Sequence, residues 1–399
     1  MEDFDVDLSD DDDEVVEGPG EWIPLSDPDM SGLEVEAMID ILRAQDITAN
    51  EAVGVFEERF AARLGRRYAV GVSGSTVATL AVLRARGIGP GDEVIASPYS
   101  WHQIAQAVAH VGAKLVMADI EYWSQTLCPK RVAEKLTPAT RAIIVGNTNG
   151  HPAPWREFRA LAEQHGLFLI EDCTESIGSR YAGKEVGSFG DVAIFDFTQP
   201  SPLVAGEGSL IVTDDLDLYN AVRQIVVCPA SERFSVATAH LPLQAPMGGM
   251  NAALALAQLD RLDTILAKRR AVAEQYLFHM RSFEGIKPPY VAPDVDEVHF
   301  HNYVVHLGTR FGKDARDQIV EDLRTAGIDV CAVCRPLHLH PVIQKLYGSK
   351  RRDFLVAEKI GDRSIAIPFH AQLTDQVCKF IVKTAKDSSA NVGAGAAIY

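Results

Sequence analysis

The sequence is short of basic residues, cysteines and long apolar runs. Its 399 residues include 38 Lys or Arg against 55 Asp or Glu, a formal net charge of −17 that argues against nucleic acid or an anionic membrane as partner. No apolar stretch approaches the roughly 18 residues that a membrane-spanning helix needs. We also expect neither a secretory signal nor a transit peptide, because the N-terminus is acidic. Six cysteines are too few for a disulfide scaffold, so we expect a cytoplasmic protein.

The negative charge is concentrated at the N-terminus. Residues 1–20 hold ten acids and no Lys or Arg. Such a block repels itself and buries little, so we predict a disordered acidic tail over residues 1–20. The tail is either a docking or solubilising segment or an inert leader, and the sequence leaves both open.

The rest of the chain has the rhythm of an α/β protein. Between residues 68 and 170, short apolar runs alternate with helical patterns, which indicates a largely parallel sheet covered on both faces. Two further runs, at 192–197 and 209–213, are expected to close that sheet as a hairpin. A long helical pattern over 251–283 ends before the proline-rich stretch 286–293. We therefore predict a large domain over 21–284 and a smaller C-terminal α/β domain over 285–399.

Candidate site residues follow the strands, where ligands bind in open α/β sheets. Residues 72–76 (Val-Ser-Gly-Ser-Thr) suit either a phosphate site at a helix N-terminus or a plain cap by Ser75. Residues 98–101 end in Trp101, which either stacks on a planar ligand or belongs to the core. Residues 170–172 (Ile-Glu-Asp) offer an acid that binds a ring nitrogen, moves a proton or is merely structural.

These segments resemble the DegT-type aminotransferases, which are pyridoxal-phosphate (PLP) enzymes of fold type I acting on keto-sugars. The resemblance implies a large domain with a mostly parallel sheet between helices, a smaller C-terminal α/β domain, and a homodimer. It also implies that Trp101 stacks on the pyridine ring, that Asp172 pairs with the ring nitrogen, and that Ser75 and Thr76 bind the phosphate. The shared segments are 23–26 (Ile-Pro-Leu-Ser), 87–95, 170–172, 187–191 (Gly-Ser-Phe-Gly-Asp), 206–208 (Gly-Glu-Gly), 256–259 (Leu-Ala-Gln-Leu) and 336–339 (Pro-Leu-His-Leu).

The sequence departs from this family around the expected cofactor. The position of the Schiff-base lysine, five residues before Gly206, holds Ser201, and a serine hydroxyl cannot form an imine. Asp196 stands where the family has a phosphate-binding serine, and Glu175 stands where it has His or Gln. The phosphate turn is inverted to Gly-Ser, and residues 246–249 (Pro-Met-Gly-Gly) replace an Arg-Met-x-Glu segment. We therefore expect no cofactor, or else PLP or pyridoxamine phosphate (PMP) bound without a covalent link.

The replacement residues are acidic. Clustered carboxylates raise one another's pKa and suit an amine-bearing small-molecule substrate. The candidate catalytic residues are Asp172, Glu175, Asp196, Ser201 and His151, and the candidate binding residues are Ser75, Thr76, Trp101, His102 and Gln199. Cys331 and Cys334 with His338 and His340 have the residue types of a zinc site, but i and i+3 on a strand point to opposite faces, so we predict no metal.

Three functions are consistent with the sequence. The first is a biosynthetic enzyme that keeps the aminotransferase fold but does not transaminate, and uses carboxylate acid/base catalysis in a dehydration, cyclisation or condensation. The second is a sugar dehydratase-like enzyme with non-covalent PLP or PMP. The third is a catalytically inactive partner subunit of an active aminotransferase.

Overall fold

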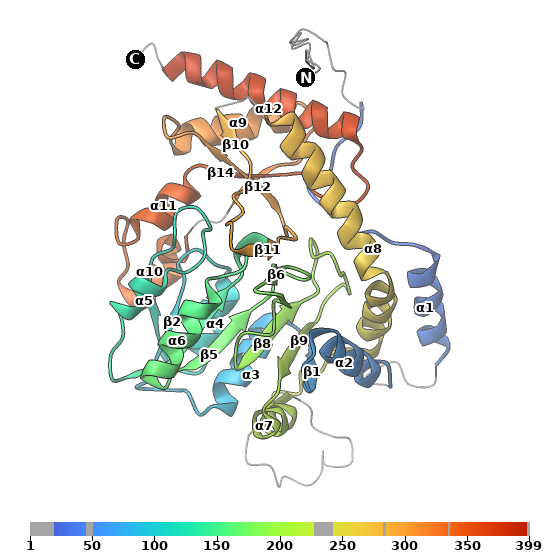
Figure 1. Ribbon diagram of the computed structural model, residues 1–399, viewed down its shortest axis with the longest axis vertical. Helices are drawn as coiled ribbons and strands as arrows, with labels where there is room; N and C mark the ends of the chain where they lie inside the picture. Colours follow the sequence, from blue (N-terminus) through green and yellow to red (C-terminus); the bar gives the residue numbers. More distant parts are fainter. Residues whose placement is uncertain (1–19, 45–50, 227–241, 282–284, 334–335, 397–399) are drawn as a thin grey trace, which may run out of the picture.

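The computed structural model describes residues 20–44, 51–226, 242–281, 285–333 and 336–396. The predicted acidic tail lies outside these residues except for Gly20. Figure 1 shows a large sheet with flanking helices below, a small sheet above, and the long helix α8 (Gly249–His279) running between them. No helix in the described ranges combines the length and apolarity needed to cross a membrane.

The large sheet has seven strands and is mostly parallel, as predicted. Neighbouring strands β3, β2, β4, β5 and β8 run in the same direction, while β9 is antiparallel to both β8 and β1. The predicted closing hairpin is therefore confirmed as β8 and β9. In spatial order the strands are β1 (Tyr68–Val72), β9 (Ser209–Thr213), β8 (Val192–Asp196), β5 (Phe168–Asp172), β4 (Thr140–Gly146), β2 (Glu93–Ala96) and β3 (Lys114–Met117).

Helices cover both faces of this sheet, which explains why its strands are apolar throughout rather than alternating. One face packs against α3 (Ser75–Ala85), α4 (His102–His110) and α7 (Leu216–Val226). The other packs against α2 (Glu51–Leu64), α6 (Trp155–His165) and the first half of α8.

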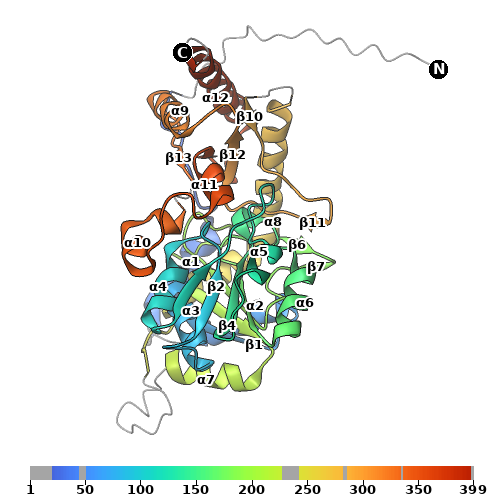
Figure 2. The same ribbon diagram turned by 90° about the vertical axis from the view of Figure 1, so that its left-hand side faces the viewer.

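The small sheet is antiparallel and lies beside the C-terminal helix. Its order is β10 (Ile286–Lys287), β12 (Tyr303–Leu307), β14 (Ser364–Ile367) and β13 (Cys331–Ala332), and it packs against α9 (Lys313–Thr325) and α12 (Asp375–Ala396). The core of this sheet also includes Ile23 and the second half of α8, residues that the sequence assigned to the large domain. Figure 2, turned by 90°, shows α9 and α12 on the outside of this part.

The remaining elements connect these two layers. They are α1 (Gly32–Arg43), α5 (Pro129–Ala133), the 3₁₀ turn η1 (Thr148–Gly150), β6 (Arg180–Tyr181), β7 (Lys184–Glu185), β11 (Val295–Glu297), the 3₁₀ turn η2 (Leu337–Leu339), α10 (Pro341–Tyr347) and α11 (Leu355–Gly361).

Glu171 on β5 fixes the loop before β8. Its fully buried carboxylate accepts hydrogen bonds from the backbone N–H groups of Gly187 (2.6 Å), Phe189 (2.8 Å) and Gly190 (2.9 Å), and from Asn147 Nδ2 (3.2 Å). The backbone approaches so closely that a Cβ on Gly190 would lie 2.6 Å from the carbonyl oxygen of Val192. Glu171 is therefore a structural acid, one of the alternatives that the sequence left open.

We expect Glu171→Gln to lower the free energy of unfolding by about 2–3 kcal/mol, because the new amide group can accept at only one atom and presents a donor to backbone donors. Urea unfolding followed by circular dichroism measures the difference. Glu163→Gln, which neutralises an exposed acid on α6, is the matched control. Equal stability of the two variants would contradict the structural role of Glu171.

Candidate active site

A cavity of about 400 Å³ lies at the edge of the large sheet where β1, β5 and β8 end. The common direction of these strands brings their following loops to one place. The lining residues are Ser73, Gly74, Ser75, Thr76, Val77, Trp101, His102, Gln103, Thr174, Glu175, Asp196, Thr198, Gln199, Pro200, Glu207 and His301. Seven of the ten candidate site residues are thus brought together: Ser75, Thr76, Trp101, His102, Glu175, Asp196 and Gln199.

One end of the cavity is the N-terminus of α3. Ser75 is the first helical residue and Gly74 the N-cap, and no side chain caps this end. The plain cap by Ser75 is therefore excluded. The first-turn N–H groups and the hydroxyls of Ser75 and Thr76 lie beside the cavity, an arrangement that suits a phosphate.

Asp172 ends β5 and is buried two residues before the cavity-lining Thr174, but it is not itself among the lining residues. Its Oδ1 accepts a hydrogen bond from the N–H of Thr174 (3.1 Å). Burial raises the pKa of Asp172 to about 6, and the charges of Asp196 and Glu171 act in the same direction. With this pKa, Asp172 is mostly ionised at pH 7 and becomes protonated as the pH falls below 6. An adjacent positive charge would favour the ionised form.

Glu175 joins two sides of the cavity. One carboxylate oxygen accepts the indole N–H of Trp101, and the other accepts the backbone N–H of Asn149 (2.7 Å). Burial, with a smaller contribution from the charge of Asp172, raises the pKa of Glu175 to about 7. Trp101 itself is 45% exposed, so its ring is not part of the core.

The side chains of Asp196 and Gln199 both form hydrogen bonds within the protein. Asp196 Oδ1 accepts a hydrogen bond from the N–H of Thr198 (2.9 Å), which turns the carboxylate partly toward its own loop. The Gln199 side chain lies on the cavity wall and donates to Ser26 Oγ (2.8 Å). His102, the first residue of α4, is exposed at the cavity rim.

Two candidate catalytic residues lie elsewhere. Ser201 is buried beside a separate small cavity that Pro28 and Arg269 also line, so its hydroxyl does not line the main cavity. His151 is buried and stacks on Tyr290. Both ring nitrogens of His151 are used, because Nδ1 contacts the carbonyl oxygen of Pro152 (2.8 Å) and Nε2 accepts from the N–H of Ala292 (3.1 Å).

The structure adds lining residues that the sequence did not indicate, namely Val77, Gln103, Thr174 and His301. His301 is 94% buried, since its relative exposure is 6%, and its Nδ1 has no hydrogen-bond partner. It lies 126 residues after Glu175, just before β12 of the small sheet, and only the tertiary fold brings it to the cavity.

The cysteine–histidine segment gives no metal centre in the described part of the chain. No group of three or more His, Cys, Asp or Glu residues there is arranged to hold a metal ion. Cys334 lies outside the described residues, and the buried His338 is engaged through Nε2 with Glu358 (2.9 Å).

Residues 28–386 match the model of the DegT/DnrJ/EryC1/StrS aminotransferase family. The chain belongs to this family. It is 32% identical over 340 residues to GDP-perosamine synthase of Caulobacter vibrioides (84% of this chain, 90% of the relative). It is 29% identical over 384 residues to the spore coat polysaccharide biosynthesis protein SpsC of Bacillus subtilis (94% and 98%).

Solved structures share the fold. DesV of S. venezuelae, solved with a ketimine intermediate, has a TM-score of 0.82 and 27% identity, covering 92% of this chain and 99% of DesV. Spr1654 of Streptococcus pneumoniae, assigned as a sugar aminotransferase and solved in its PMP form, has a TM-score of 0.88 and 23% identity, covering 94% and 99%. The predicted fold type I is confirmed.

Two sequence-based predictions are wrong. An enzyme that does not transaminate and works without a cofactor is contradicted by the aminotransferase family match and by DesV, which was solved with a ketimine intermediate. The physical reason is that the cavity still offers groups suited to such a cofactor, because the uncapped N-terminus of α3 suits a phosphate and the exposed ring of Trp101 lines the same cavity.

We expect the fluorescence of Trp101 to titrate with a midpoint near pH 7, because the acceptor of its indole N–H is Glu175, whose pKa is about 7. Below the midpoint Glu175 is neutral and the charge-assisted bond is lost; above it the carboxylate is restored. The Trp101→Phe variant supplies the contribution of the other tryptophans. Glu175→Gln should abolish the transition, and a transition that survives in this variant would assign it to another group.

Proposed function

We propose that this protein is a sugar aminotransferase that uses PLP and PMP in the cavity between α3 and Asp172. The family match and the names of the relatives support an enzyme of this class. The observation that carries the proposal is an uncapped helix N-terminus that lines the cavity, together with the buried carboxylate of Asp172 two residues before the lining residue Thr174. These are the groups that a phosphate and a protonated ring nitrogen require.

The described residues fit the cofactor at three points. The first turn of α3 with Ser75 and Thr76 would bind the phosphate, Asp172 would pair with the ring nitrogen, and Trp101 offers an aromatic surface. No lysine lines the cavity within the described residues, and position 201 is serine. We therefore propose that these contacts hold the cofactor without a covalent bond to the chain.

When bound, the cofactor supplies the carbonyl or amine group and the electron-withdrawing ring through which an amino group is transferred. The protein's part is to hold and move protons, and Glu175 has the properties for it. Its pKa of about 7 lets it exchange a proton at neutral pH, and its bonds to Trp101 and Asn149 fix its position. We therefore assign proton transfer to the Glu175 carboxylate rather than to the hydroxyl of Ser201.

The sugar substrate would reach the cavity from the side of Gln199, Glu207 and His301. We propose an amine-bearing or keto form of a nucleotide-linked sugar, in keeping with the GDP-perosamine synthase relative. The small-molecule nature of the substrate also agrees with a net charge of −17, which disfavours nucleic acid.

We further propose a homodimer, which the family resemblance implies. The exposed apolar side chains of α1 support it, because such a stripe on a surface helix suits a protein contact. They are Leu33, Val35, Ile39 and Leu42, each more than 40% exposed. A reducing compartment such as the cytoplasm is part of the proposal, since Cys128, Cys173, Cys331 and Cys378 are free thiols.

The purified protein should bind PMP, and Asp172→Asn should weaken this binding about tenfold, or about 1.4 kcal/mol, because the ring nitrogen loses its anion. Isothermal titration calorimetry measures both constants, with Glu163→Gln as the control. Borohydride treatment of the PLP-loaded protein should leave no adduct on the chain. A reduced adduct on any side chain would contradict non-covalent binding.

Glu175→Gln should slow amino transfer by a factor of about 10² to 10⁴, the usual contribution of a positioned acid–base group, while PMP binding stays within threefold. The measurement is a single turnover of the PLP-loaded protein with GDP-perosamine, followed by absorbance. An unchanged rate in this variant would remove Glu175 from the proposed mechanism, and no turnover by the wild type would exclude this substrate.

A further inference from the structure

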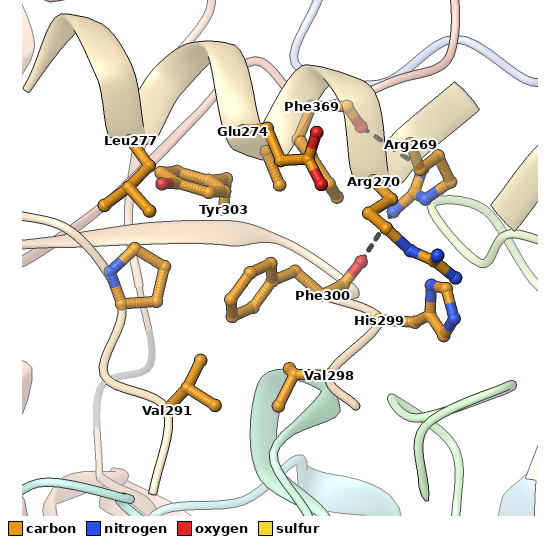
Figure 3. A pocket seen from close by; sticks show the side chains of 12 residues that line it. Arg269, Arg270, Glu274, Leu277, Val291, Val298, His299, Phe300, Tyr303 and Phe369 are labelled. Carbon is orange, nitrogen blue, oxygen red and sulfur yellow. Dashed lines mark hydrogen bonds between the residues drawn. The ribbon is translucent and has the colours of Figure 1, made fainter. Parts of the chain in front are cut away.

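Arg269 on α8 is a buried cation that binds backbone carbonyl groups. It is 5% exposed, and burial lowers the pKa of its guanidinium to about 10, so it remains charged at neutral pH. It donates to the carbonyl oxygens of Phe300 (2.8 Å), His301 (2.9 Å) and Phe369 (3.3 Å). Figure 3 shows two of these bonds, which join the helix to the strand segment below it and to Phe369 above. No carboxylate pairs with Arg269 in the part of the chain that the structure describes.

These bonds compensate the desolvation of the guanidinium. Its carbon also lies 4.5 Å from the centre of the Phe369 ring, a favourable cation–π distance. The contacts of a buried charge restrict the segments that it binds to one arrangement. Here the arrangement is the path of residues 299–301, which brings His301 to the cavity wall.

The 299–301 segment, to which Arg269 is hydrogen-bonded, packs closely against the turn η1, which follows β4 of the large sheet. Gly150 in this turn has φ +92°, and a Cβ placed on it would lie only 2.1 Å from the carbonyl oxygen of His299. Asn149 before it is also left-handed, with φ 50° and ψ 29°. Such a backbone is sparsely populated for a residue other than glycine, so it needs support on both sides.

Asn149 receives that support from two directions. Its N–H donates to Glu175 Oε2 (2.7 Å), and its carbonyl oxygen accepts the N–H of His301 (3.4 Å). The hydrogen bonds therefore run in one series from the indole of Trp101 through Glu175, Asn149 and the backbone of His301 to Arg269.

We propose that Arg269 is a positioning residue of the active site, which sets the orientation of Glu175 from α8 through the backbone of His301 and Asn149. Arg269 touches neither the cavity nor Glu175. Its role is to keep the 299–301 segment against η1, so that the N–H of Asn149 stays aimed at the carboxylate. The proposal rests on the proposed function only for the proton-moving role of Glu175.

The pKa of Glu175 reports this arrangement, because the Asn149 N–H bond favours the ionised carboxylate. The other titratable groups around the Glu175 carboxylate come from several elements, and none of them is substituted in the test. They are Asp172, Asp196, Glu207, His102 and His301.

The test is the Trp101 fluorescence titration of the full chain without cofactor. Arg269→Met should move the midpoint to higher pH by at least about half a unit, since Glu175 loses its backbone donor. Gly150→Ala should shift it in the same direction, because the added Cβ separates η1 from His299 without changing any charge. Arg270→Met is the matched control: Arg270 is the next residue, is half exposed and pairs with Glu297 on the surface, so the midpoint should stay unchanged.

Several outcomes would overturn the proposal. The first is a folded Arg269→Met variant that keeps the wild-type midpoint. The second is a midpoint shift in Arg269→Met that Gly150→Ala does not reproduce, because the loss of the Arg269 charge alone would then explain the shift. If Arg269→Met does not fold, Arg269→Lys keeps the charge with fewer donors, and a smaller shift of the same sign is expected; no shift there counts against the proposal. PMP titration of the wild type separates the two ideas, since failure to bind PMP refutes the proposed function and leaves the midpoint shift standing.

Discussion

The alternation of side chains along β5 is the constraint on which the site depends. Glu171 and Asp172 are adjacent, so their side chains leave the strand on opposite faces. Glu171 is turned to the N–H groups of the 187–190 loop and has its charge fully compensated there. Asp172 accepts a hydrogen bond from the N–H of Thr174, a residue that lines the cavity. A shift of one residue in register would exchange the surroundings of these two carboxylates.

The sequence predicts the large sheet well because each strand and helix of that sheet is marked by a pattern of neighbouring residues. Apolar runs separated by helical patterns specify a parallel sheet, and parallel strands bring residues such as Ser75, Trp101, Glu175 and Asp196 to one edge. The same logic cannot place His301, because its position depends on packing between two sheets. It also fails for Ser201 and His151, whose distance from the cavity is decided by the path of their loops.

The wrong prediction about the cofactor has a different origin. Five positions around the expected cofactor depart from the family, and each affects a different part of the binding free energy. A serine at position 201 bears only on a covalent link to the cofactor, whereas Asp196 is partly engaged with its own loop through Thr198. The glycine–serine inversion moves the cap to Gly74 and leaves the N–H groups of α3 available. The groups that suit a phosphate and an aromatic ring therefore do not depend on the residue at position 201.

The cavity also depends on contact between the two sheets. Glu175, Asn149 and Trp101 belong to the large-sheet side, while His301 leads into the small sheet and Arg269 lies on the helix that spans both. A carboxylate with a pKa near neutrality is sensitive to a single hydrogen bond, because one pKa unit corresponds to about 1.4 kcal/mol. The turn at Asn149 supplies such a bond, and His299 packs closely against Gly150 in the same turn. Under the proposed role of Arg269, loosening the contact between the 299–301 segment and η1 would therefore change the pKa of Glu175, which ties the proton chemistry proposed for the cavity to the packing of the two sheets.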